Sequence, residues 1–132
     1  MTSKIQLGAR VLLGLIYFVF GVMGLAIAFG LMKMPTEPMP QAAETFMKGI
    51  MATGYFLPLL KTTETACGFL LLINRGAPLA LVILAPITLN IFLFHANLTP
   101  GSSNLVFPLV MVVLHVTAMS ACWKLYKPLL SK

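Results

Sequence analysis

Charged residues are scarce in this 132-residue chain, where Asp, Glu, Lys and Arg together make up only 9% of the sequence. A soluble domain carries about 25% charged residues, because they cover its surface. Hydrophobic residues account for 59% of the chain, and the mean hydropathy is +0.96. The composition therefore predicts an integral membrane protein whose main solvent is lipid.

Motifs for common metal and nucleotide chemistry are also missing. The two cysteines, Cys67 and Cys122, lie inside apolar segments without CxxC spacing, so they predict neither a metal site nor a disulfide framework. The sequence contains no Gly-rich phosphate loop and no HExxH motif. The net charge of +6 does not indicate nucleic-acid binding, because the cations stand at the ends of apolar segments without clustering or interleaved aromatics.

Four apolar segments are each long enough to cross a bilayer core, which takes ~20 helical residues. They cover residues 11–31, 55–73, 78–95 and 106–123. These segments predict an all-α membrane protein in one domain, residues 1–132, built as a bundle of four transmembrane helices. Since the chain is spent almost wholly on crossing the bilayer, the lipid itself is its first expected partner.

Small residues recur along the first segment at Gly14, Gly21, Gly24 and Ala28, with Tyr17 in step. A stripe of small side chains lets a neighbouring helix approach closely. We expect this stripe to be a packing face, and the alternative is that it lines a ligand cleft.

A short helix is expected between the first two spans. Prolines at positions 35, 38 and 40 cannot continue a helix. After them, residues 41–51 place Ala43, Phe46 and Ile50 on one side, while Glu44 and Lys48 form an i,i+4 pair on another. Such an amphipathic segment is typical of a helix lying at the membrane interface.

The distribution of Lys and Arg predicts the orientation of the bundle. Lys33 and Lys48 belong to one side, and six cations belong to the other, which holds the N-terminus, the turn at 74–78 and the C-terminus. Positive charge favours the cytoplasm, so both termini are expected there. The six cations are Lys4, Arg10, Arg75, Lys124, Lys127 and Lys132.

Five polar side chains are placed by depth, taking the midpoint of each span as the bilayer centre. Glu64 and His115 fall at the centre, Lys61 and Asn90 lie roughly 4.5 Å toward the outside, and His95 falls near the outer boundary. We therefore expect Lys61, Glu64, Asn90 and His115 to lie within about one helical turn of one another. The two histidines differ in depth by roughly 12 Å, which argues against a shared metal or haem.

Three interpretations of this polar group stay open. Polar residues are expensive in hydrocarbon, so they face inward and find partners. They can act as interhelical glue. They can line a pocket for a ligand or redox partner, or they can move a proton or an ion.

Several stretches together resemble the DoxX-like family of small four-helix bacterial membrane proteins. The resemblance covers essentially the whole chain and rests on the order and spacing of its pieces. The pieces are Ala9–Tyr17; Gly54-Tyr55 leading through Pro58 to Glu64 and Gly68; Pro78-Leu79-Ala80-Leu81 leading to Ala85-Pro86; Asn90-Ile91-x-x-Phe94-His95; and the tail Tyr126–Leu130.

The resemblance implies a multi-pass protein of the bacterial inner membrane, often described as a redox-associated subunit. A related eukaryotic branch looks like a membrane-protein assembly chaperone. Glu64, Asn90 and His95 match the polar pattern of the family, whereas Lys61 and His115 are candidates on depth alone.

We accordingly expect a small subunit or accessory protein of a redox-linked or assembly complex, without catalytic activity of its own. Its partners would be other membrane subunits or further copies of the chain. One alternative is a quinone-reactive oxidoreductase subunit, in which Glu64, Asn90 or His95 hydrogen-bonds a quinone carbonyl. That alternative requires an apolar cavity with Asn90 or Glu64 at its end. The other is a small-molecule transporter acting as an oligomer.

Overall fold

The computed structural model describes residues 3–33, 39–99 and 101–131, and this part of the chain is helical throughout apart from its connections. Four helices are long and apolar enough to cross a membrane, as the sequence predicts. They are α1 (Lys4–Ala28), α3 (Phe56–Ile73), α4 (Ala77–Asn97) and α5 (Ser102–Ser120). The chain closes with the short α6 (Trp123–Tyr126) and a 3-10 turn, η1 (Lys127–Leu130).

The first helix differs most from its predicted bounds. It begins at Lys4 rather than near residue 11, because Ser3 and Gln6 form a capping box that satisfies the first backbone N–H groups. It ends at Ala28 rather than residue 31, since Gly30 takes the left-handed conformation at φ +75°. The first turn of α1 is thus helical although it carries the polar side chains of Lys4 and Gln6.

The small-residue stripe of α1 is a packing face, as predicted. Gly14, Gly21 and Gly24 are all buried. A Cβ added at Gly14 would lie 2.8 Å from Cβ of Leu71 in α3, and one added at Gly68 of α3 would lie 2.6 Å from the backbone nitrogen of Phe18. The glycines therefore let the two backbones approach more closely than any larger side chain would allow.

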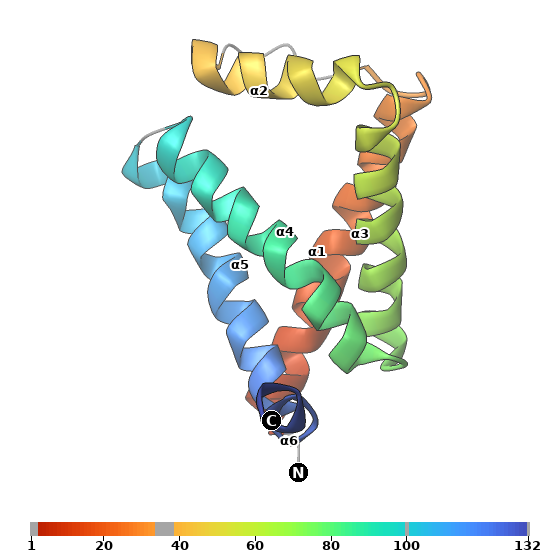
Figure 1. The fold of residues 1–132 in the computed structure, drawn as a ribbon, viewed down its shortest axis with the longest axis vertical. Coiled ribbons are helices and arrows are strands. Elements are labelled where there is room, and N and C mark those ends of the chain that lie inside the picture. Colours follow the sequence, from red (N-terminus) through yellow and green to blue (C-terminus); the bar gives the residue numbers. More distant parts are fainter. Residues whose placement is uncertain (1–2, 34–38, 100, 132) are drawn as a thin grey trace.

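The remaining elements are arranged around this pair (Figure 1). In that view α4 crosses in front of α1, and α5 lies beside α4. The helix predicted at 41–51 is present as α2 (Gln41–Ala52), and it lies across one end of the bundle. Both termini lie at the opposite end.

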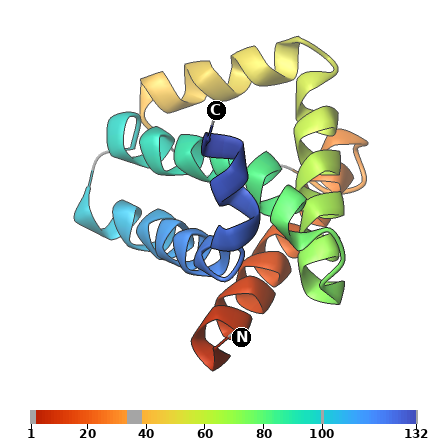
Figure 2. The ribbon, with the colours of Figure 1, turned by 60° about the horizontal axis from the view of Figure 1, so that its bottom comes forward.

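Figure 2 brings forward the end of the bundle that carries the termini. Two side-chain hydrogen bonds join helices there. Nε2 of Gln6 donates to Oγ of Ser120 over 2.8 Å, which joins α1 to α5. The Tyr126 hydroxyl donates to the carbonyl of Pro78 over 2.7 Å, which joins α6 to the start of α4. Burial raises the pKa of Tyr126 to about 12, so its hydroxyl stays protonated and remains a donor.

The α1–α3 contact predicts a sharp difference between two glycine substitutions. Gly68→Ala should destabilise the fold by about 1–3 kcal/mol, because its Cβ would meet backbone atoms that no side-chain rotation can move. Gly8→Ala, where the added Cβ meets open space, should be neutral or slightly stabilising. Thermal unfolding in detergent can be followed by labelling of the buried thiol of Cys67 in a Cys122→Ser background. Equal melting temperatures for the two variants would contradict the close contact.

Candidate functional site

A cavity of about 870 Å³ lies between α2, α3 and α4. Its walls are largely apolar, with aromatic rings from all three helices at Phe46, Phe56 and Phe94. Phe46 of α2 meets Phe94 of α4 edge to face, with 5.3 Å between the ring centroids. The apolar side of the amphipathic helix α2 therefore forms one wall of the cavity, and the Phe46–Phe94 ring pair joins α2 to α4.

Four of the five predicted polar residues line this cavity: Lys61 and Glu64 from α3, and Asn90 and His95 from α4. Spacings of three, four and seven residues put the lining side chains of each helix on one face. Of these residues, Asn90 is exposed, whereas Glu64 is buried, with only 3% of its surface accessible. The polar lining thus includes an exposed amide and a buried carboxylate.

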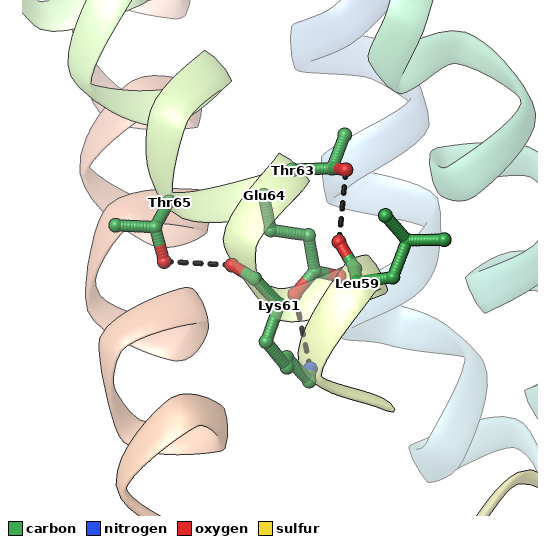
Figure 3. Close-up of polar contacts among 5 residues, drawn as sticks. All are labelled: Leu59, Lys61, Thr63, Glu64 and Thr65. Atoms are coloured by element: carbon green, nitrogen blue, oxygen red, sulfur yellow. Dashed lines mark hydrogen bonds and ion pairs between the residues drawn. The ribbon is translucent and has the colours of Figure 1, made fainter. Parts of the chain in front are cut away.

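Lys61 and Glu64 pair with each other across one turn of α3, as expected from their i,i+3 spacing (Figure 3). Nζ of Lys61 lies 3.0 Å from Oε2 of Glu64. Within the described part of the chain, this oxygen has no partner with hydrogen-bond geometry, so it has a Coulombic contact but no well-aligned donor. It is therefore an acceptor with unused capacity.

The Lys61 side chain is held in place by α1. The stem of Lys61 packs where Gly24 has no side chain, since a Cβ there would collide with Cδ of Lys61. The backbone carbonyl of Lys61 also accepts from Oγ1 of Thr65 over 2.7 Å. Figure 3 shows Thr65 directed toward α1, away from Glu64. The charged end of Lys61 is thereby directed to Glu64, although the side chain is long enough to reach elsewhere.

His115 does not line this cavity. It is buried in a separate network in which Oγ1 of Thr88 lies 2.8 Å from its Nδ1, and Tyr17 from α1 contacts the same Thr88 hydroxyl. Depth along a helix is set by sequence position, but the face a residue presents depends on how the helices rotate. Depth alone therefore could not predict which groups His115 contacts.

Proton positions in this second network follow from its partners. Nε2 of His115 lies 2.8 Å from the carbonyl oxygen of Leu81, which can only accept, so Nε2 carries the proton. In the neutral ring Nδ1 is then an acceptor, and the Thr88 hydroxyl donates to it. The Thr88 oxygen in turn accepts from the Tyr17 hydroxyl. Three helices are joined by one chain of satisfied polar groups.

His95 makes a local bond. Its Nδ1 donates to the carbonyl of Ile91 over 2.8 Å, one turn earlier in α4. That bond engages Nδ1, so the other ring nitrogen, Nε2, does not take part in it. The ring also lies beside Phe94, with 5.3 Å between centroids. His95 therefore lines the cavity as a polar ring in an aromatic setting.

The roles of Tyr17 and Thr88 were not foreseen from the sequence. Tyr17 was noted only as part of the small-residue stripe, and Thr88 is a single hydroxyl inside an apolar span, where threonine commonly bonds its own backbone. Thr65 and Thr117 do just that. No three His, Cys, Asp or Glu side chains gather as metal ligands in the described ranges.

No family model, curated protein or solved structure matches the chain. The resemblance to DoxX-like proteins therefore stays a prediction from the sequence pieces quoted above.

The Tyr17–Thr88–His115 network predicts unequal losses on substitution. Thr88→Val leaves both the Tyr17 hydroxyl and Nδ1 of His115 buried without a partner, which should cost about 1–3 kcal/mol for each group. Tyr17→Phe removes only the hydroxyl that donates to Oγ1 of Thr88, and the Thr88 hydroxyl still donates to His115. Its loss of stability should therefore be smaller. Thr117→Val on the same helix as His115 is the matched control, and its melting temperature, measured by Cys67 labelling, should hardly change. A Thr88→Val variant as stable as Thr117→Val would contradict the network.

Proposed function

We propose that this chain is a multi-pass membrane protein that binds a small amphipathic molecule of the quinone class between α2, α3 and α4. It would act as a subunit or accessory protein of a redox-linked complex. The cavity of about 870 Å³ carries this proposal. Solid packing around Lys61, Glu64 and Asn90 would have favoured a purely structural role for them.

The size and lining of the cavity suit such a ligand. Small-molecule sites measure about 300–1,000 Å³ and combine mostly apolar walls with a few placed polar groups. Phe46, Phe56 and Phe94 supply aromatic surface for a flat ring. An isoprenoid or alkyl tail is apolar, so it would extend into the surrounding lipid.

The polar groups also fit the two chemical forms of a quinone. The Asn90 amide can donate to a carbonyl oxygen, and the buried Glu64 oxygen can accept from a hydroxyl of the reduced form. A quinone exchanges electrons together with protons when it is bound. The residues of this chain would orient the ring, and the Glu64 carboxylate, its charge balanced by Lys61, would accept a hydrogen bond from the reduced form.

In the proposed orientation, both termini and the α3–α4 turn lie in the cytoplasm. Helix α2 lies at the opposite, outward-facing surface of the same membrane. The six-to-two distribution of Lys and Arg supports it. The amphipathic character of α2, which carries the exposed Glu44–Lys48 pair, supports an interfacial location. The bacterial inner membrane follows from the resemblance to DoxX-like proteins.

Ligand binding can be tested by titrating detergent-solubilised protein with a short-chain ubiquinone analogue in a calorimeter. Asn90→Leu should weaken binding by about fivefold, the contribution of one net hydrogen bond. Asn97→Leu is a matched control in the same helix, because Asn97 bonds the carbonyl of Leu93 and does not line the cavity. Absence of saturable binding to the unmodified protein would overturn the proposal, and equal losses in both variants would put the ligand elsewhere.

Orientation can be tested with single cysteines in a Cys67→Ala, Cys122→Ala background. The exposed positions 3, 42 and 131 sample the two ends of the bundle. In intact bacterial cells an impermeant thiol reagent should label Ala42→Cys and leave Ser3→Cys and Ser131→Cys unlabelled. Inverted membrane vesicles should reverse the pattern. Labelling of Ser3→Cys in intact cells would contradict the proposed topology.

A further inference from the structure

A second groove, of about 660 Å³, lies at the end of the bundle that carries the termini. Val82 of α4 and Val116 of α5 form one side. Trp123, Tyr126 and Leu129 of the C-terminal segment form the other. Apart from the hydroxyls of Ser120 and Tyr126 and the indole N–H of Trp123, the side chains of its walls are apolar. The groove therefore matches a hydrocarbon chain rather than a polar ligand.

The charges at this end of the bundle have one sign. Lys124 and Lys127 are exposed and belong to the same short segment as Trp123 and Tyr126. The sequence holds three acidic residues, all between positions 37 and 64, so none belongs to α4, α5 or the C-terminal segment. Each lysine directly follows a groove-lining aromatic residue in the sequence, and no acidic residue belongs to the elements that form the groove.

Aromatic residues fix the depth at which such a groove would lie. Tryptophan and tyrosine are enriched at the level of lipid headgroups, and lysines beyond them reach the phosphates. Trp123 is 54% exposed at the edge of the groove, whereas Tyr126 is held inward by its bond to Pro78. A groove lined by these two aromatic residues therefore suits the level at which acyl chains meet headgroups.

We propose that this groove binds an anionic phospholipid. One acyl chain would lie between Val82, Val116 and Leu129, and the headgroup phosphate would pair with Lys124 and Lys127. The site is separate from the cavity beneath α2 and does not depend on what that cavity binds. Charge complementarity favours a lipid of the cytoplasmic leaflet over a partner helix, because a negative surface attracts cations that flank a membrane span.

The protein carries its own probe for this site, since Trp123 is the single tryptophan of the chain. Bromine atoms on lipid chains quench tryptophan fluorescence at short range. The full chain would be reconstituted into phosphatidylcholine vesicles containing increasing fractions of brominated phosphatidylglycerol or, in parallel, brominated phosphatidylcholine. We expect the brominated anionic lipid to quench Trp123 at severalfold lower fractions than the brominated zwitterionic lipid.

Lysine substitutions test where the preference arises. Lys124→Gln and Lys127→Gln should each weaken the preference by about fivefold. The double variant Lys33→Gln, Lys48→Gln removes as many cations as the Lys124→Gln, Lys127→Gln double variant, but from elsewhere in the chain. It should leave the lipid preference unchanged. Salt at about 1 M, which shortens the Debye length to about 3 Å, should reduce the preference.

Three outcomes would overturn the proposal. Equal quenching by the two lipids would show that the groove has no headgroup preference. An unchanged preference in the Lys124→Gln, Lys127→Gln double variant would place the anionic lipid elsewhere. If neither lipid quenched Trp123, something else, such as a second copy of the chain, would cover the groove.

Discussion

The close approach of α1 to α3 at their glycines determines how the rest of the structure can be arranged. Gly14 and Gly68 let the backbones touch, and Gly24 gives space to the stem of Lys61. Once this face of α3 is turned toward α1, Glu64 lies on a neighbouring face and is directed toward α4. The two helices thus act as one support, and the candidate site is built on the side of α3 that this contact leaves available.

A second constraint is that polar groups inside an apolar bundle need partners, and the structure meets it in two different ways. The Tyr17–Thr88–His115 network is complete, since each of its hydrogen atoms has an acceptor. The Lys61–Glu64 pair is incomplete, because one buried oxygen lacks an aligned donor and the pair borders open volume. The first arrangement is what helix-to-helix adhesion requires, whereas the second leaves bonding capacity for a ligand.

The sequence predicted the four long helices because an uninterrupted apolar run has few other outcomes. It also predicted the glycine packing face and the pairing of Lys61 with Glu64, since both follow from spacing within one helix. Contacts between different helices were harder to predict from the sequence. Depth placed His115 level with Glu64, but it could not predict that His115 bonds Thr88 and lies outside the cavity lining. The cavity itself depends on α2 crossing the bundle and meeting α4 through Phe46, and nothing in its amphipathic pattern gives that direction.

The pairing of Lys61 with Glu64 also has an electrical consequence. Two opposite charges 3.0 Å apart form a short dipole with no net charge, so the cavity is neutral overall. An uncharged molecule that moves between lipid and such a cavity carries no charge through the membrane field, and the transmembrane voltage does no work on it. A charged molecule would exchange about 2.3 kcal/mol with that field for each charge carried across 100 mV. A neutral ligand that enters from the lipid would therefore occupy the cavity equally whether or not the membrane is energised.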